Sequence, residues 1–419
     1  DFTQYFKNRL YYIDVKGMLS SLHGSAGAIT ALQNSVAHYY QRASSADYLG
    51  VDPTRRSLTG TGGYVKVGRK GNAKWNFSET FTWSSPGFDL NDMGYMKETD
   101  YLMNETEIMY RQTDIWKIFR YNAFTLSQKN MWNYGGTPFS NNASLRWQSM
   151  TMNRYEWDVK ETFAWNWLDS RLLRGGPDVR FGSYFLTSAK FNTDKAKRMM
   201  FMLKYEGDHN FEGNRFNTIS PSLTFRLGNH VYLSGQLDYA WNTDEMQYVA
   251  TTSPLSSSSL APYYYVMGHM DQKTYGLTLK LQVNVTPDIS IQFYGAPFTS
   301  IAKYDDFKLA ADTKSHTFEN RFQRIDPDQL TYADGVYTIG EGAGQMPFRN
   351  PDFRFNEFRS NLVARWEYLP GSTLYFVWEH RMSNRDNWYS SGWGSNLDRM
   401  WGLPATNTFM IKMNYWFNL

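Results

Sequence analysis

Cysteine is absent from this chain of 419 residues. The protein therefore has no disulfide bond, no thiolate ligand for a metal and no cysteine nucleophile, a composition that suits an exported protein without requiring one. Histidine is also scarce, and His23, His269 and His316 stand far apart, without the spacing typical of metal ligands. We therefore expect no metal and no other cofactor.

Long hydrophobic runs are missing as well. No segment approaches the roughly 20 apolar residues that a membrane-spanning helix needs, and the mean hydropathy is −0.57, which excludes a helical membrane protein. The start, DFTQYFKNRL, lacks the basic and apolar regions of a signal peptide. We expect either that a leader was removed or that the sequence begins partway through a longer precursor. The net charge of only +3 gives no electrostatic reason to expect nucleic acid as a partner.

Aromatic residues, in contrast, are abundant, and they make up 17% of a chain whose hydropathy is low. A transmembrane β-barrel combines these two properties, because only alternate residues of each strand face lipid, and Tyr and Trp gather at the membrane interfaces. A large secreted β-sandwich or β-propeller has a similar composition. The pattern of strands and connections has to decide among these classes.

Alternation with period two is clearest in three segments and at the end of the chain. Between Thr274 and Thr286, apolar side chains alternate with polar ones without error, and residues 218–227 and 231–241 repeat the pattern. The final segment, Thr408 to Leu419, is an amphipathic strand rich in aromatic residues. Such a strand is typical of the end of an outer-membrane barrel, and also of an edge strand in a soluble β protein.

The connections between the predicted strands alternate between short and long. Outer-membrane barrels have short periplasmic turns at one rim and long external loops at the other, whereas a sandwich or propeller has no reason to show this alternation. The segments around 102–115 and 120–133 show poor strand patterning. The short connections lie near Gly71 and at 152–154, 227–230, 286–288 and 369–372, and the long ones lie at 20–57, 86–101, 168–180, 243–271, 300–355 and 384–406.

We therefore predict an all-β protein, a transmembrane antiparallel β-barrel of about 16 strands or more, with residues 1–419 as one barrel domain. If the chain ends at the periplasmic rim, Arg9–Leu19 ascends and Asp1–Phe6 is the tail of an earlier strand. The last strand then pairs either with Arg9–Leu19, in a sixteen-stranded barrel, or with a strand of a larger barrel that this sequence lacks.

The alternation assigns the residues of each predicted strand to one of two faces. The predicted lumen-lining residues are Glu156, Asp158, Lys160, Arg226, Gln236, Asp238, Lys280, Gln282, Asn284, Arg359 and Arg365. The predicted residues of the lipid-facing wall and its aromatic girdles are Trp75, Trp83, Trp157, Trp165, Tyr239, Trp241, Phe409, Tyr415 and Phe417.

A repeated motif, W-x3-ETF-x-W, occurs at 75–83 and at 157–165. Both copies place a glutamate, Glu79 or Glu161, in the lipid-facing register, where a carboxylate is costly unless it lies near an interface. An interfacial position or a chance similarity explains the motif, and a contact with another protein on the barrel wall is the alternative.

No group of residues predicts catalysis. Asp208-His209 occupies a predicted loop tip whose glycines and asparagines are those of a tight loop. His380 lies near a predicted rim, where a hydrogen bond is a simpler interpretation than a general base. The glycine-rich segment 60–71 lacks the strand-to-helix context of a phosphate-binding loop, so its glycines are explained by a narrow strand and turn. We assign no catalytic residue.

Two long connections have features of their own. Ile29, Leu32 and Val36 have helical spacing, which predicts a short helix that packs on the rim. The longest connection, 300–355, carries nearly balanced acidic and basic residues. It either folds into the lumen and constricts it or forms an external cap.

Four stretches, at 85–101, 173–180, 290–300 and 350–378, resemble a domain-of-unknown-function family of Gram-negative outer-membrane proteins, often described as carbohydrate-binding family 9-like domain proteins. The resemblance extends over nearly the whole chain. It implies the C-terminal barrel part of a longer precursor, without the N-terminal β-sandwich module that members typically carry. It implies no catalytic residue, and the carbohydrate association belongs to the missing module.

These observations predict an integral protein of the bacterial outer membrane, with long loops outside and the C-terminus at the periplasmic rim. It would serve as a passive or gated, porin-like conduit, or as the membrane anchor of a surface complex that handles nutrients or glycans. Expected partners are outer-membrane lipid and lipopolysaccharide, proteins of such a complex, and a small solute or glycan. The alternatives are a rim-active hydrolase or acyltransferase, a loop-filled scaffold subunit, and a fragment of a TonB-dependent transporter. We expect a protein without enzymatic activity rather than an enzyme.

Overall fold

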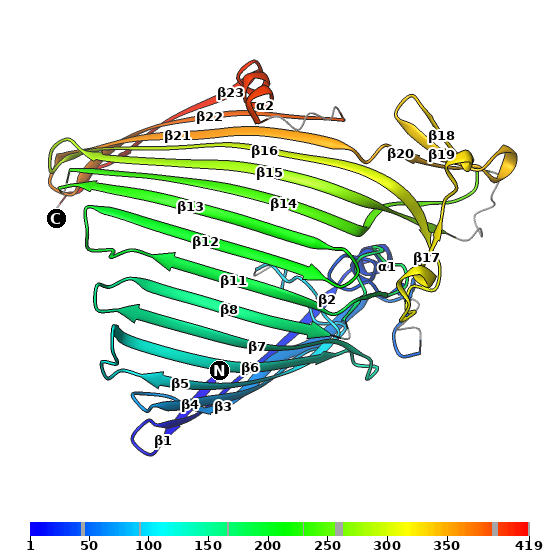
Figure 1. Cartoon of the computed structure of the whole chain (residues 1–419), viewed down its shortest axis with the longest axis horizontal. Helices are drawn as coiled ribbons and strands as arrows, with labels where there is room; N and C mark the ends of the chain where they lie inside the picture. The colour runs from blue at the N-terminus through cyan, green and yellow to red at the C-terminus, as the bar shows by residue number, and fades with distance from the viewer. Residues whose placement is uncertain are drawn as a thin grey trace.

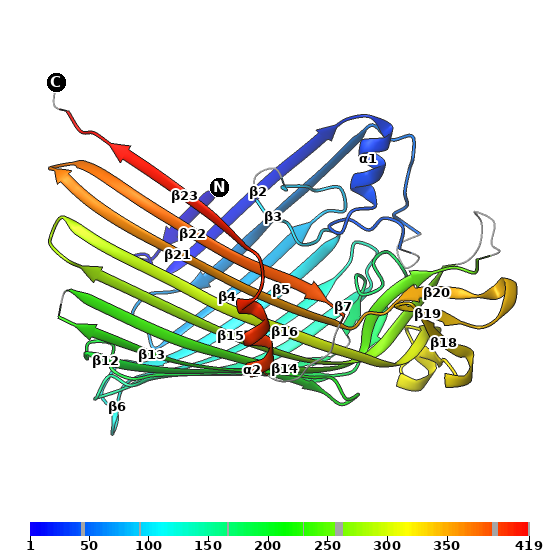
Figure 2. The same ribbon diagram turned by 90° about the horizontal axis from the view of Figure 1, so that it is seen from above.

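One large antiparallel sheet dominates the structure, a computed structural model that describes residues 1–42, 47–91, 94–165, 167–228, 230–255, 263–387 and 393–417. This sheet has 18 strands, of which the short β17 (Phe322–Arg324) pairs only with the end of β16. The other strands follow one another in chain order, each antiparallel to the next, and they form a curved wall (Figures 1 and 2).

The wall strands are joined mostly as successive hairpins. They are β1 (Phe2–Phe6), β2 (Tyr11–His23), β3 (Ser57–Arg69), β4 (Trp75–Ser84), β5 (Tyr101–Gln112), β6 (Phe119–Trp132), β7 (Pro138–Thr151), β8 (Glu156–Trp165), β11 (Tyr184–Asn192), β12 (Met199–Asn210), β13 (Arg215–Leu227), β14 (Val231–Thr252), β15 (Tyr264–Asn284), β16 (Ile289–Ala310), β21 (Phe353–Leu369), β22 (Ser372–Asp386) and β23 (Ala405–Asn414).

The smaller elements lie in the long connections. They are α1 (Ala26–Gln33), β9 (Trp167–Asp169) paired with β10 (Val179–Phe181), a three-stranded sheet of β18 (Leu330–Ala333), β19 (Val336–Ile339) and β20 (Met346–Arg349), α2 (Trp393–Trp401), and the 3-10 helices Phe318–Arg321, Pro327–Gln329 and Gly342–Gly344. Among the described residues, neither α-helix is long and apolar enough to cross a membrane.

Short and long connections lie at opposite ends of the wall, which we call the short-turn end and the long-loop end (Figure 1). The predicted short connections are confirmed, and two of them depend on glycines at positive φ, Gly71 at +115° and Gly371 at +79°. The predicted helix near Ile29 is confirmed as α1, whose first turn is capped by the Ser25 side chain, but it ends at Gln33 and leaves Val36 outside.

The two edges of the wall are β1 and β23. Strand β2 pairs with β1 and β3, so of the two alternatives for the last strand, the pairing with Arg9–Leu19 does not form in this structure, and Phe2–Phe6 is confirmed as a separate earlier strand. Strand β23 pairs with β22 along one side. It begins at Ala405 and ends at Asn414, so it starts and stops earlier than the predicted segment 408–419, and Leu419 lies outside the described residues. No closed ring forms within the described part of the chain.

Strands β14, β15 and β16 are all much longer than the sequence pattern predicts. The predicted loop 243–271 is wrong, because β14 continues to Thr252 and β15 already begins at Tyr264. The predicted loop 300–355 likewise starts too early, since β16 continues to Ala310. Asp208 and His209 also lie within β12 and not at a loop tip.

The extended ends of β14–β16 carry the largest hydrophobic cluster. Val266, Tyr304 and Phe307 pack there against Ile339 and Phe348 of the three-stranded sheet, which Figure 1 shows beyond the long-loop end. Residues 326–349 are therefore packed on this strand extension. The remaining part, 311–325, joins other loops, as described below.

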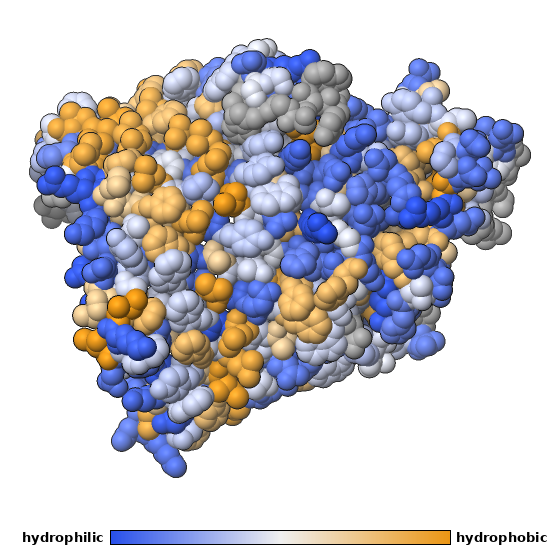
Figure 3. Space-filling model, in the orientation of Figure 1, coloured by the Kyte–Doolittle hydropathy of each residue, from blue (hydrophilic) through white to orange (hydrophobic). Residues whose placement is uncertain are grey.

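The wall has an apolar face and a polar face, because successive side chains point to opposite sides. On the apolar face, Leu233, Leu237 and Leu279 are 43%, 42% and 40% exposed although they are large hydrophobic residues. Figure 3 shows apolar residues gathered on the side of the short-turn end, whereas hydrophilic residues cover the long-loop end. Helix α2 covers one part of the apolar face, where Trp401 contacts Phe358 of β21.

Candidate functional site

The residues that the alternation assigns to one face of the sheet do share a face in the structure. The eleven residues predicted to line a lumen all lie on the polar face, on β8, β13, β14, β15 and β21. Of the predicted lipid-facing residues, Trp75, Trp83, Trp157, Trp165, Tyr239, Trp241 and Phe409 lie on the apolar face, whereas Tyr415 and Phe417 follow the end of β23. That one face lines a lumen and the other meets lipid remains a prediction.

Charged side chains on the polar face pair with one another across neighbouring strands. Asp158 accepts a hydrogen bond from Nε of Arg146 at 2.8 Å, and Ser220 donates to Asp238 at 2.5 Å. Glu357 lies 2.9 Å from the guanidinium groups of both Arg359 and Arg381. The polar face is therefore a charged, mutually hydrogen-bonded surface, of the kind that lines an aqueous channel.

At the long-loop end, several connections fold over this polar face and form what we call the loop layer. In the described part of the chain it comprises residues 24–42, 47–56, 85–91, 94–100, 133–137, 167–183 and 311–325. The backbone N–H of Asp89 donates to Oγ of Ser20 on β2 at 2.9 Å. The ring of Phe88 lies against Gly62 of β3, where an added Cβ would come within 2.5 Å of it. Glycine at position 62 thus provides the space in which the loop is anchored to the wall.

Asp100 joins three of these loops. It is 2% exposed, and its carboxylate accepts hydrogen bonds from Arg42 at 2.8 Å, from the hydroxyl of Tyr48 at 2.6 Å and from the backbone N–H of Tyr134 at 3.1 Å. Burial, together with the bond to Asp100, raises the pKa of Tyr48, and burial raises the pKa of Tyr40 to about 12. Both phenols therefore stay protonated at neutral pH.

Further ion pairs connect the remaining loops to this centre. Arg171 lies 3.8 Å from Glu98. Arg321 is 1% exposed, lies 2.8 Å from Glu212, and donates a hydrogen bond to the backbone carbonyl of Arg180. Because buried or half-buried charges are costly to separate from their partners, these contacts hold the loop layer in one arrangement.

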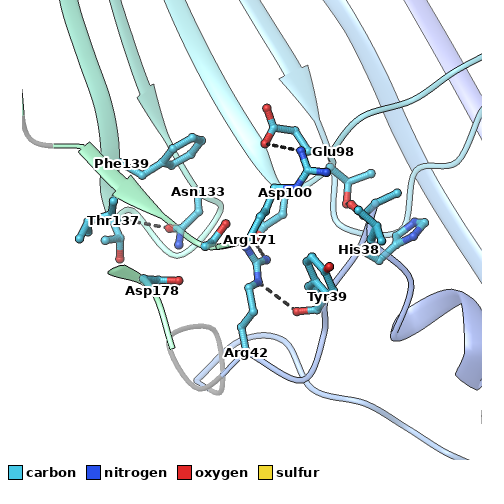
Figure 4. Close-up of a pocket in the computed structure, with 15 residues that line it drawn as sticks. His38, Tyr39, Arg42, Glu98, Asp100, Asn133, Thr137, Phe139, Arg171 and Asp178 are labelled. Atoms are coloured by element: carbon cyan, nitrogen blue, oxygen red, sulfur yellow. Dashed lines mark hydrogen bonds and ion pairs between the residues drawn. The ribbon is translucent and has the colours of Figure 1, made fainter. Parts of the chain in front are cut away.

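A cleft of about 550 Å³ opens within the loop layer. The aromatic side chains of Tyr39, Phe139 and Trp167 line it together with the charged side chains of Arg171 and Arg174. A narrower pocket, shown in Figure 4, adjoins it and shares Tyr39, Phe139 and Arg171 in its lining. Aromatic faces beside a few charged groups suit the binding of a small polar solute. We call this cleft the loop cleft.

The loop layer also contains a serine, a histidine and an aspartate that approach one another. Ser35 Oγ lies 3.1 Å from Nδ1 of His38, whose Nε2 lies 3.2 Å from the carbonyl of Phe88 and 3.9 Å from Asp89. The carbonyl can only accept, so Nε2 donates and the neutral ring accepts from Ser35. Burial, outweighing the opposing effect of Asp89, lowers the pKa of His38. The imidazole is wholly buried, so this group tethers the loop and cannot reach a substrate.

His23, His230, His269 and His380 have structural partners as well. His380 lies 2.9 Å from Oδ1 of Asn407 on β23, a hydrogen bond of the kind that the sequence predicts. Among the described residues, no group of three or more histidine, aspartate and glutamate side chains has the geometry of a metal site.

Comparison with known proteins places the chain in a family. The family model of the domain of unknown function DUF5916 matches residues 24–419. The chain belongs to the DUF5916 family. This agrees with the resemblance to a domain-of-unknown-function family, and does not test the carbohydrate-binding family 9-like description or the expected N-terminal module.

The other comparisons add little. No curated protein matches the chain. The crystal structure of the siderophore receptor PirA from Acinetobacter baumannii is similar over 98% of this chain and 69% of that chain, with 9% sequence identity and a TM-score of 0.38. A likeness this low assigns neither a fold nor an activity.

Sequence reasoning did not find the residues of the loop layer. Arg42, Asp100 and Arg171 lie in three different connections, and each is paired with a residue that is distant in the sequence. The available signal was limited to the length of these connections and their unusual content of aromatic and charged residues.

Proposed function

We propose that the chain forms most of the wall of a transmembrane β-barrel in the bacterial outer membrane, and that this barrel is a conduit gated by its loop layer. The exposed leucines of the apolar face support the membrane position. In water, an uncovered apolar surface of this extent favours aggregation, whereas in a bilayer the same surface meets lipid tails. The paired charges of the polar face then line the lumen.

Closure of the barrel requires strands beyond those of the wall. The wall strands alternate in direction, and β1 and β23 both run toward the short-turn end (Figure 1). Direct pairing of these two edges would be parallel, so an antiparallel closure needs an odd number of additional strands between them. The second half of β2, beyond Val15, also lacks its β1 partner. Unpaired edges in hydrocarbon are so costly that we propose such strands as part of the complete barrel.

The loop layer is the observation that supports gating. The loops fold over the polar face and are joined through Asp100, Arg171 and Arg321, all of which are paired with charges of opposite sign or with hydrogen-bond donors. Such a layer closes the long-loop end against free diffusion. Because these specific ion pairs hold the loops together, the layer opens when the pairs are separated.

The loop cleft suggests the class of solute. Tyr39, Phe139 and Trp167 offer apolar faces, and Arg171, Arg174, Glu98 and Asp169 offer charges of both signs. A small polar molecule with one apolar face, such as a sugar or a short peptide, has the matching chemistry. With the short-turn end in the periplasm, as in known outer-membrane barrels, the cleft faces the outside.

Conductance of the complete barrel protein in a planar lipid bilayer tests the gate. The wild type is expected to conduct weakly or in brief openings. The double variant Arg42→Ala, Arg171→Ala should open more often, because it removes two of the ion pairs that join the loops. Lys74→Ala is the matched control, since Lys74 forms an exposed ion pair with Asp114 near the short-turn end.

A folded barrel is recognised by its altered mobility on a gel before heating, which keeps a failure to fold apart from a failure to conduct. Equal conductance of the double variant and the wild type would contradict the gate.

A scaffold is the second candidate, because the loops already occupy the long-loop end. It predicts no conductance for any folded variant, including the double variant. The same bilayer measurement therefore separates the two functions.

A further inference from the structure

The apolar face is interrupted by a polar area on β4–β7. Pairing across these strands brings Asn104, Asn130 and Asn141 into one row and places Glu79, Thr106 and Gln128 in the adjacent row. The side chains of these six residues point to the same face of the wall as Phe77, Phe81 and Leu126, which are exposed large hydrophobic residues. We call the six residues the amide patch.

The amide patch lies between two aromatic rows of the apolar band. On the side of the short-turn end, Trp75 packs against Tyr110 on the same face. On the side of the long-loop end, the row next to the three asparagines carries Trp83 and Trp132, and both of them pack against Phe81. Aromatic rows of this kind mark the two interfaces of a membrane, so the amides between them lie at the depth of the hydrocarbon.

The amide groups have no partners within their own wall. In the described part of the chain, Thr106 donates to Glu79 at 2.6 Å, and no side-chain hydrogen bond is found for Asn104, Gln128, Asn130 or Asn141. An amide without a partner is expensive in hydrocarbon, where no water is available.

The corresponding part of β13–β15 shows that the patch is not a general property of the wall. From Val231 to Tyr239 of β14, the paired rows of this face carry aliphatic and aromatic residues, for example Leu223, Leu237 and Leu279, and polar residues such as Lys273 and Asp271 appear only nearer the long-loop end. Lipid can cover that surface without cost. The amide patch therefore marks a sector of the wall that something other than lipid covers.

We infer that the amide patch is the contact between two copies of this chain in the membrane. A two-fold interface places the same surface on both sides, so that surface must be complementary to itself. Amides meet this condition, because each has both a donor and an acceptor, and the amides of one copy can also donate to Glu79 of the other. Ala143, which follows Gln128 in the paired row, leaves room for close approach. This inference rests on the proposed membrane position of the wall.

Disulfide cross-linking in native membranes tests the contact, and the absence of native cysteine makes single substitutions unambiguous. Gln128→Cys and Ala143→Cys place a thiol in the patch, and Leu279→Cys is the control on the opposite sector of the same face. Oxidation should convert most of at least one patch variant into a dimer of the chain and leave Leu279→Cys monomeric. The triple variant Asn104→Leu, Gln128→Leu, Asn130→Leu should abolish dimers of the detergent-solubilised protein while the barrel keeps its heat-dependent mobility.

The possible results separate this inference from the proposed function. Labelling of Leu279→Cys by a water-soluble maleimide in intact membranes would contradict the membrane position itself. If Leu279→Cys is protected but neither patch variant cross-links, the membrane position stands and the dimer is refuted. An adduct between a patch variant and a different protein also refutes the dimer, since another partner then occupies the patch.

Discussion

Substitution of Asp100 by alanine should open the loop layer. The Asp100 carboxylate is wholly buried and accepts hydrogen bonds from Arg42, Tyr48 and the backbone of Tyr134. Removal of one member of a buried ion pair leaves the other charge without compensation, at a cost of about 3–5 kcal/mol. Asp100 also adopts a φ of +62°, which aspartate tolerates better than alanine, so the substitution adds backbone strain.

Hydrogen exchange measured by mass spectrometry reports this cost directly. A loss of 3 kcal/mol in the free energy of local opening raises exchange rates about a hundredfold, because each 1.4 kcal/mol corresponds to a factor of about ten. The increase should appear in peptides from residues 24–42 and 94–100 and be absent from the central part of β13–β15.

Asp114→Ala is the matched control. Asp114 pairs with Lys74 at 3.2 Å, but both side chains are more than half exposed, and such pairs contribute at most about 1 kcal/mol. Asp100→Asn keeps the shape and the tolerance of positive φ but removes the charge, so it should fall between the two. The reasoning is refuted if Asp100→Ala exchanges no faster in these loops than Asp114→Ala.

Three further predictions concern the same layer. Gly62→Ala should destabilise the contact between the loop and the wall by about 1–3 kcal/mol, because the added methyl group clashes with the ring of Phe88. In a double-variant cycle measured by hydrogen exchange, Gly62→Ala should cost less when Phe88 is already replaced by alanine. Acidification below about pH 6.5 should loosen residues 24–42, because His38 takes up a proton when this segment unfolds, whereas the buried ring, with its lowered pKa, resists protonation. Limited proteolysis between pH 7.5 and 5.5 should show this loosening, and His38→Gln should remove it. Arg321→Ala removes the cation that pairs with Glu212 and should lower the free energy of local opening of residues 311–325 by about 3 kcal/mol, which speeds their hydrogen exchange. Unchanged exchange would show that this ion pair does not hold the loop.

The sequence predicts the wall well where one face is uniformly apolar. In β15, Leu277, Leu279 and Leu281 alternate with polar residues, so both the strand and its register could be predicted. The ends of β14 and β15 were missed for a physical reason. Irregular pairing between Asp244 and Gln247, and again near Tyr248, shifts the alternation, so the pattern ends while the strand continues.

The poorly patterned segments have a different cause. Strands β5 and β6 carry polar side chains on both faces, because Asn104, Gln128 and Asn130 lie on the same face as the hydrophobic Ile108 and Leu126 of these two strands. The weak strand pattern of these two segments therefore reflects the amide patch on the apolar face. The loop layer could not be predicted, since Asp100 and Arg42 are 58 residues apart in the chain and meet only when their loops fold over the wall.

Cysteine scanning of β15 in membranes tests the central claim most directly, which is that one face of the wall meets lipid and the other lines an aqueous lumen. Single cysteines at Leu279, Lys280, Leu281 and Gln282 are exposed to a small water-soluble maleimide. The account predicts labelling at Lys280→Cys and Gln282→Cys, and protection at Leu279→Cys and Leu281→Cys until the membrane is dissolved. Equal labelling at all four positions in intact membranes would contradict it.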